Sequence, residues 1–247
     1  MRVALWGIGN HAKNNLIPAL NEAKNIEFIG VYSRNKANVS EVISTYRCRT
    51  WTTSEEMVED KGLDAIVLST PPGVHFQQGM EIISSGKHLL VEKPITTNLK
   101  QTLTLLKEAK ERNLLVLEGF MFLYHPHFEK IKQIINKEKS LLKEIEVSFE
   151  LPTLPSPGYR FDKLLGGSCL YDVGSYTVIS ILELFKDCQI SLINSEIKLD
   201  SVINIDISGQ ASFVIDGYIK CNLTWSYNSD YKNKIIIKTE DKEYISD

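Results

Sequence analysis

The first half of the chain alternates short apolar runs with amphipathic segments. The runs are rich in Val, Ile and Leu and lack strict alternation, which is typical of parallel strands that are covered on both faces. They occupy residues 3–7, 26–32, 65–69, 88–91 and 114–118. Strands that take turns with helical segments predict a doubly wound α/β domain.

One of the intervening segments shows the clearest helical period. Residues 98–112 are expected to form a helix that begins after Thr97 as its N-cap. Its apolar stripe, which we expect to face the sheet, consists of Leu99, Leu103, Leu106 and Ala109.

The second half of the chain has a different pattern. A helix is expected at 126–138, with Phe128, Ile131 and Ile135 as its apolar stripe, and another at 167–185. Strict alternation of apolar and polar residues predicts strands with one buried face at 145–151, 203–213 and 219–225. The sequence therefore predicts an N-terminal Rossmann-type domain at 1–122 and an α+β domain with a mostly antiparallel sheet at 123–247. The Pro-rich stretch 152–158 is expected to be an irregular loop.

Composition narrows the function. The 247 residues include 28 Lys and Arg against 31 Asp and Glu, and this balance disfavours a nucleic-acid partner. No apolar run is long enough to cross a membrane. A secretory signal would lie at the N-terminus, but residues 2–7 have the pattern of a buried strand. We therefore expect a cytoplasmic protein without a bound metal, in which four dispersed cysteines stay reduced. These are Cys48, Cys169, Cys188 and Cys221.

A glycine-rich turn follows the first expected strand. Gly7, Gly9 and Ala12 match Gly-x-Gly-x-x-Gly/Ala at the junction of a strand and a helix. The first Gly makes the turn, the second allows the backbone to approach a pyrophosphate, and Ala12 allows close helix packing. An ordinary tight turn is the alternative, but this context favours a dinucleotide site.

The end of the second strand distinguishes NAD from NADP. A carboxylate there would bind the ribose 2′-hydroxyl of NAD, but the chain has Ser33 and Arg34. Both side chains suit a 2′-phosphate, so the sequence favours NADP, with NAD as a possible cofactor. The alternative is a solvated basic loop.

Two further groups could carry chemistry. Lys93, between Glu92 and Pro94, follows a strand at the edge of the sheet where such folds bind ligands. Asp172 and Tyr176 are four residues apart on the expected helix 167–185, so they share a face. By themselves, a solvated Lys and a buried hydrogen-bonded pair would be the ordinary interpretations.

Taken together, these residues resemble the glucose–fructose oxidoreductase, inositol dehydrogenase and rhizopine-catabolism family (Gfo/Idh/MocA) along most of the chain. The segments that carry the resemblance, besides the Gly7 turn and Ser33-Arg34, are Thr70-Pro71-Pro72-Gly73-Val74-His75, Gly86-Lys87-His88-Leu89-Leu90-Val91-Glu92-Lys93-Pro94, Glu118-Gly119-Phe120-Met121-Phe122, His125-Pro126 and Gly166-Gly167-Ser168-Cys169-Leu170-Tyr171-Asp172-Val173-Gly174-Ser175-Tyr176. Many members have His where this chain has Tyr176, and members usually continue beyond the position of Asp247.

The resemblance implies an NAD(P)-dependent oxidoreductase that acts on a carbonyl or hydroxyl carbon of a sugar, polyol or diol. It implies that Tyr176 transfers the proton, that Lys93 lies beside the nicotinamide, and that Asp172 orients the substrate or Lys93. His125 is a weaker candidate for a substrate contact. The remaining expected cofactor contacts are Ile8, Asn10, His11, Thr70, Pro71, Glu92 and His75, of which His75 is also expected to cap or pack the next helix. A non-catalytic dinucleotide-binding sensor, or a degenerate shortened paralogue, is the competing hypothesis.

Self-association is also expected. The outer face of the antiparallel sheet would carry Tyr218 and Thr224, with Tyr227 and Tyr231 nearby, and such a surface is typical of interfaces. The resemblance also implies pairing through this face, so we predict a homodimer or a larger even-numbered homo-oligomer. Residues 234–238 are expected to form an unprotected edge strand.

Overall fold

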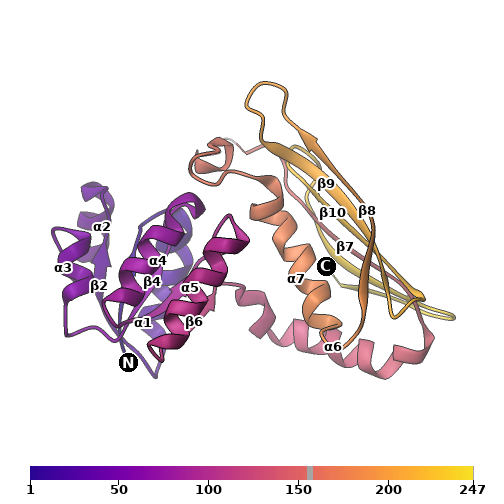
Figure 1. Cartoon of the computed structure of the whole chain (residues 1–247), viewed down its shortest axis with the longest axis horizontal. Coiled ribbons are helices and arrows are strands. Elements are labelled where there is room, and N and C mark those ends of the chain that lie inside the picture. Colours follow the sequence, from indigo (N-terminus) through magenta and orange to yellow (C-terminus); the bar gives the residue numbers. More distant parts are fainter. Residues whose placement is uncertain (155–157, 247) are drawn as a thin grey trace. The chain divides into compact units, whose positions relative to one another are not determined.

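The computed structural model describes residues 1–154 and 158–246 (Figure 1). It divides into two compact units, Met1–Gly119 and the part from Phe120 onward. Residues 155–157, within the predicted Pro-rich loop, lie outside the described part. Among the described residues, no helix is long and apolar enough to cross a membrane.

The first unit is a six-stranded parallel sheet between two helical layers. Its strand order is β3-β2-β1-β4-β5-β6. The strands are β1 (Arg2–Trp6), β2 (Glu27–Tyr32), β3 (Arg49–Thr50), β4 (Ala65–Leu68), β5 (His88–Val91) and β6 (Val116–Glu118). The helices are α1 (Ile17–Glu22), α2 (Lys36–Tyr46), α3 (Ser54–Glu59), α4 (His75–Ser84) and α5 (Leu99–Glu111).

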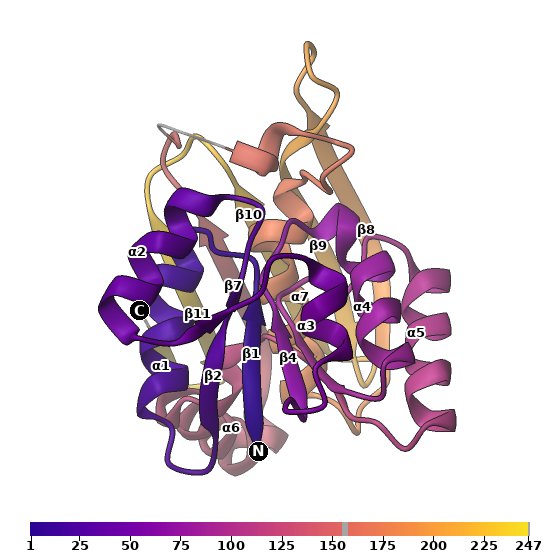
Figure 2. The ribbon, with the colours of Figure 1, turned by 90° about the vertical axis from the view of Figure 1, so that its left-hand side faces the viewer.

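Strand β1 shows why these runs lack alternation. Val3 and Leu5 pack on one face of the sheet with α1 and α2, and Ala4 and Trp6 pack on the other face with α3, α4 and α5 (Figure 2). Every position is therefore apolar. The chain order reverses between β1 and β4, and a ligand crevice is expected at the carboxyl ends of strands at such a point.

Helix α5 corrects two predictions. Its N-cap is Asn98 instead of Thr97, because the Asn98 side chain accepts hydrogen bonds from the N–H groups of Lys100 and Gln101. The predicted stripe was wrong at its three leucines, since Leu99 and Leu103 are 73% and 58% exposed and Leu106 is exposed as well. The helix buries Leu105 and Ala109, which lie one turn apart and form a narrower contact face.

The second unit is a six-stranded sheet with helices on one face. Its strand order is β12-β11-β7-β10-β9-β8, and all pairs are antiparallel except β7 and β10. The elements are α6 (Pro126–Glu138), β7 (Leu142–Glu150), α7 (Ser175–Leu184), β8 (Ile190–Leu199), β9 (Asp206–Ile215), β10 (Ile219–Ser226), β11 (Lys232–Thr239) and β12 (Glu243–Ser246). The predicted fold class, a Rossmann unit followed by an α+β unit, is confirmed.

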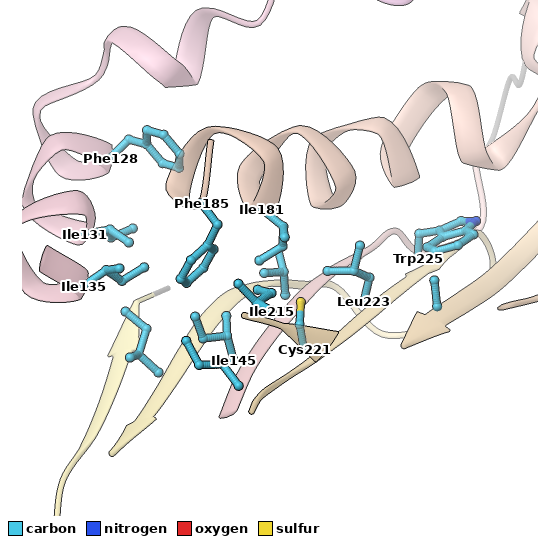
Figure 3. Packing of buried hydrophobic residues seen from close by; sticks show 14 of the residues in the cluster. Phe128, Ile131, Ile135, Ile145, Ile181, Phe185, Ile215, Cys221, Leu223 and Trp225 are labelled. Carbon is cyan, nitrogen blue, oxygen red and sulfur yellow. The ribbon is translucent and has the colours of Figure 1, made fainter. Parts of the chain in front are cut away.

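One hydrophobic core joins helices and sheet in this unit. Phe128, Ile131 and Ile135 of α6 belong to the same buried cluster as Ile145 of β7 and Leu223 of β10 (Figure 3). The predicted stripe of α6 and the alternation of β10 are thus confirmed. The predicted helix 167–185 begins as a π-helical turn, Leu170–Gly174, and continues as α7.

The edges of this sheet differ from the prediction. Residues 234–238 belong to β11, which is not an edge strand because β12 pairs with Ile235–Lys238. The edge strands are the short β12 and the long β8. The sequence analysis predicted neither of these two strands. A bulge between Leu192 and Asn194 interrupts the period of β8, so its residues do not show a simple alternation.

Candidate functional site

The turn after β1 has the geometry of a phosphate site. Gly7 has a φ of +101°, and a Cβ there would lie 2.5 Å from the Ser69 carbonyl oxygen, so only Gly fits. Around Gly9 the space is open, because no heavy atom lies within 4 Å of a Cβ built there. Ala12 is fully buried where the helix packs on the sheet. The turn thus leaves backbone N–H groups and open space for an anion.

The loop after β2 is fixed to this turn. Asn35 caps α2, accepting hydrogen bonds from Ala37 and Asn38, and its own N–H donates to the Ser33 hydroxyl. The Asn38 amide donates to the Ile8 carbonyl at 2.7 Å and joins the two loops. Ser33 is largely buried, whereas Arg34 is exposed. An exposed guanidinium beside a dinucleotide turn suits a phosphate group.

His75 lies in the interior of the first unit. Its Nε2 is 2.7 Å from the Thr70 carbonyl and its Nδ1 is 2.9 Å from the Pro94 carbonyl. Burial lowers its pKa. The side chain is fully buried. Through these two carbonyls His75 connects the loops after β4 and β5, so it positions both loops.

The segment after β5 contains Glu92 and Lys93. Glu92 lies beside His11 of the glycine-rich turn, with 3.3 Å between Oε1 and Nε2. Lys93 is half-buried and directly precedes Pro94. The sequence analysis assigned no role to Glu118, whose carboxylate accepts a hydrogen bond from the Ile95 N–H at 2.7 Å. Burial raises the pKa of Glu118. Its hydrogen bond to Ile95 holds the backbone of this segment in place.

In the second unit, Asp172 has partners that the sequence analysis missed. Its Oδ2 accepts hydrogen bonds from Arg160 Nε at 2.6 Å and from the Tyr227 hydroxyl at 3.0 Å. Burial is the main cause that raises the pKa of Tyr227, so its hydroxyl stays neutral and donates. Asp172 lies in the π-helical turn before α7, and these bonds hold the start of that helix. Arg160 and Tyr227 are 12 and 55 residues away, so no local pattern could identify them.

Tyr176 lies on the first turn of α7 among aromatic rings. The ring centroids of Phe120, Phe122 and Phe149 are 5.7, 5.5 and 5.4 Å from its own. Edge-to-face contacts with Phe120 and Phe149 fix the orientation of the phenol ring. Its hydroxyl is 4.0 Å from the Met121 sulfur. Tyr176 therefore combines a rigid ring with a polar end.

A cavity of about 280 Å³ adjoins Tyr176 within the second unit. Aromatic and aliphatic side chains line most of it, and the imidazoles of His125 and His127 add polar atoms. The His125 Nδ1 accepts a hydrogen bond from the His127 N–H, and His127 lies 3.1 Å from the Ser246 hydroxyl. The structure thus brings two predicted site residues, His125 and Tyr176, to one cavity.

Comparisons with known proteins agree with this geometry. Residues 1–120 match the model of the Gfo/Idh/MocA oxidoreductase family with an NAD-binding Rossmann fold. The chain is 24% identical over 234 residues to a dTDP-3,4-didehydro-2,6-dideoxy-alpha-D-glucose 3-reductase of Saccharopolyspora spinosa, which covers 94% of this chain and 70% of the relative. A D-xylose 1-dehydrogenase (NADP(+)) of Haloferax volcanii is 27% identical over 181 residues, 72% of this chain and 55% of that protein.

A solved structure shares the fold over the whole chain. The 3-ketoreductase KijD10 of Actinomadura kijaniata, in complex with NADP and TDP-benzene, superimposes with a TM-score of 0.90. The match covers 100% of this chain and 83% of KijD10 at 21% identity. The pairing of a Rossmann unit with an α+β unit is therefore a known architecture.

Proposed function

Because this chain belongs to the Gfo/Idh/MocA family of oxidoreductases, we propose that it is an NADP-preferring enzyme that reduces a keto group of a nucleotide-linked sugar. The observation that carries the proposal is the position of Tyr176, a rigid phenol at a cavity that it shares with His125. A phenol in such a position can exchange a proton with a substrate oxygen. The other unit of the same chain carries the glycine-rich turn.

The residues of the first unit fit the proposed cofactor. The open space at Gly9 and the backbone N–H groups after it suit the pyrophosphate. Ser33 and Arg34 suit a 2′-phosphate, with Arg34 as the charged partner. NADP in the related KijD10 structure supports this choice. When bound, the nicotinamide supplies the hydride.

Tyr176 is the proposed proton donor in the direction of reduction. The phenol gives its proton to the carbonyl oxygen and takes it back in the reverse direction. Lys93 is the proposed second catalytic group, because its ammonium can hold a ribose or substrate oxygen. Asp172 keeps the start of α7 in place through Arg160 and Tyr227.

The cavity supports a sugar as the substrate. Sugar rings present apolar C–H faces and polar edges, so a site for them needs aromatic surface together with hydrogen-bonding groups. Phe122, Phe149 and Tyr176 supply the first, and His125 and Asn233 supply the second. The relatives that are dTDP-keto-sugar 3-reductases favour a nucleotide-linked keto-sugar within this class.

We also propose a cytoplasmic location. All four cysteines are free thiols in the structure, as expected for a reducing compartment. The proposal includes self-association as a homodimer or a larger even-numbered homo-oligomer through the outer face of the second unit's sheet.

A screen for cofactor consumption tests the function. The purified chain is mixed with NADPH and with nucleotide-linked keto-sugars, aldoses, ketoses and inositols, and the loss of absorbance of the reduced nicotinamide is followed. We expect consumption with a nucleotide-linked keto-sugar and its loss in Lys93→Met, with NADPH binding retained. NADPH binding without consumption of any compound would contradict the proposal and favour a non-catalytic sensor.

A further inference from the structure

One peptide group in the segment after β5 is held at both ends. The carbonyl oxygen of Pro94 lies 2.9 Å from Nδ1 of His75, and the N–H of the same peptide group, which belongs to Ile95, donates to the Glu118 carboxylate at 2.7 Å. His75 begins α4 and Glu118 ends β6, so side chains from two elements meet at this peptide group. Lys93 is the residue before Pro94. The position of its backbone therefore depends on these two side chains.

The His75 ring faces two carbonyl oxygens with one proton. Burial lowers the pKa of His75, so the ring is neutral near pH 7 and has a single N–H. A carbonyl oxygen can only accept a hydrogen bond. Thr70 offers one to Nε2 at 2.7 Å, and Pro94 offers one to Nδ1 at 2.9 Å. Both separations suit a hydrogen bond, but only one of the two carbonyls receives the proton at a time.

The two carbonyls belong to different kinds of peptide group. The Thr70 carbonyl is joined to the nitrogen of Pro71, which has no N–H. The Pro94 carbonyl is joined to the nitrogen of Ile95, whose N–H donates to Glu118. Hydrogen bonds in a chain polarise one another, so donation to the Pro94 carbonyl strengthens the bond from Ile95 to Glu118. A proton on Nε2 gains no such support, and the contrast favours a proton on Nδ1.

The loop after β4 also has hydrogen bonds that do not involve the ring. The Thr70 hydroxyl donates to Gln78 of α4 at 2.6 Å. The Val74 N–H donates to the Pro71 carbonyl at 3.1 Å. Because these bonds hold the loop, the Thr70 carbonyl can go without the ring proton.

We propose that His75 carries its single proton on Nδ1, donates it to the Pro94 carbonyl and acts together with Glu118 as a positioning residue for Lys93. The group that reaches cofactor or substrate is Lys93, and His75 and Glu118 act through its backbone. The role of Lys93 rests on the proposed function, whereas the place of the proton and the hold on the peptide group do not.

Two substitutions of His75 distinguish the two carbonyls. The amide nitrogen of Asn can take the place of Nδ1 and that of Gln the place of Nε2, so His75→Asn can keep the bond to Pro94 and His75→Gln the bond to Thr70. Exchange of the Ile95 amide hydrogen for deuterium, followed by NMR, reports on the held peptide group. We expect this exchange to be about tenfold faster in His75→Gln than in His75→Asn, and kcat to be lower by a similar factor, because one hydrogen bond is lost. A merely structural role would lower the melting temperature of both variants and leave both ratios near one.

Glu118 has a matched pair of its own. Glu118→Gln keeps an oxygen that can accept from the Ile95 N–H, whereas Glu118→Met removes the acceptor. Exchange of the Ile95 amide should be about tenfold faster in Glu118→Met than in Glu118→Gln. Equal exchange in the two variants would contradict the role of Glu118.

NMR of the chain labelled with 15N-histidine shows the proton directly. Long-range correlations between ring carbon-bound hydrogens and ring nitrogens distinguish a protonated from an unprotonated nitrogen, and His75→Asn identifies the signals of His75. We expect the proton on Nδ1 at pH 7. A proton on Nε2 would overturn the proposal, and so would equal Ile95 exchange in His75→Asn and His75→Gln. If neither of these variants folds, the wild-type spectrum and the Glu118 pair decide. If the wild-type chain consumes NADPH with no compound, the proposed function fails, while the spectrum and the exchange rates still decide this inference.

Discussion

The candidate site of the first unit is formed by backbone groups, whereas the candidate site of the second unit is formed by side chains. In the first unit the turn after β1 depends on backbone: Gly7 has a conformation that other residues avoid, and Gly9 leaves open space. In the second unit the site depends on side chains from distant segments, since Arg160 and Tyr227 hold Asp172 and phenylalanines surround Tyr176. A backbone site needs few residue types at fixed spacing, whereas a side-chain site needs the completed fold.

The difference matches the two tasks. A phosphate can be bound by N–H groups at a helix N-terminus, and these are the same for every sequence that folds this way. Proton transfer needs one specific group in one orientation, and packing must provide that orientation. Substitution of Tyr176 should therefore act on the chemistry, and substitutions in the glycine-rich turn should act on cofactor binding or folding.

The largest effect is expected at Tyr176. Tyr176→Phe keeps the ring contacts and removes the proton donor, so turnover should fall by about 10²–10⁴-fold. NADPH affinity, measured by fluorescence titration, should stay within about twofold, because Tyr176 belongs to the other unit. Tyr231→Phe, at an exposed tyrosine, is the matched control. Near-normal turnover of Tyr176→Phe would remove the role assigned to it.

Arg34 tests the cofactor choice of the first unit. Arg34→Asp replaces an attraction for the 2′-phosphate by repulsion, and the preference for NADPH over NADH should shift by about 2–4 kcal/mol, some 30- to 1,000-fold. Calorimetric Kd values for both cofactors give the shift. Lys24→Asp, at an exposed lysine of the same unit, controls for net charge. Equal wild-type affinity for NADH and NADPH would show that Ser33 and Arg34 do not select the cofactor.

Arg160 and Tyr227 test whether the second site depends on distant partners. Arg160→Met removes the charge-assisted bond between Arg160 and the buried Asp172 carboxylate, and it should lower the free energy of unfolding by about 1.5–3 kcal/mol. Tyr227→Phe should cost about 1 kcal/mol. Urea denaturation measures both, with Lys163→Met in the same loop as control. Unchanged stability in Arg160→Met would mean that this bond does not support α7.

An effect of similar size is expected from the backbone of the glycine-rich turn. Gly7→Ala should destabilise the protein by about 1–3 kcal/mol, because its Cβ would meet the Ser69 carbonyl and φ is positive. Gly9→Ala should keep its thermal stability and lose NADPH affinity, since its Cβ enters only the open space. Equal stability of the two variants would show that Gly7 is not required by geometry.

Much of the fold could be predicted from the sequence, because buried strands, half-buried strands and amphipathic helices space their apolar residues differently. The same reasoning failed at α5: a helical period shows that Leu99 and Leu103 share a stripe, but not that the stripe faces solvent. It also missed β8, where a bulge shifts the alternation and both faces carry apolar residues.

In the candidate sites, too, local features could be predicted from the sequence and contacts between distant residues could not. The glycine-rich turn could be predicted because its signal is local. The partners of Asp172 could not be predicted, because Tyr227 is 55 residues away in sequence and reaches the Asp172 carboxylate only in the folded second unit. His75 was expected to pack at its helix and does so, but the carbonyls that it binds belong to two loops 24 residues apart in sequence, at Thr70 and Pro94.

Transfer of deuterium from cofactor to sugar tests the central claim most directly. The wild-type chain is incubated with NADPH that carries deuterium at both hydrogen positions of nicotinamide C4 and with the nucleotide-linked keto-sugar found in the screen, and the sugar is analysed by mass spectrometry. The account predicts a product one deuterium heavier at the former carbonyl carbon, and at least about a hundredfold less of it with Tyr176→Phe over the same time. An unlabelled sugar from protein that binds NADPH would contradict it.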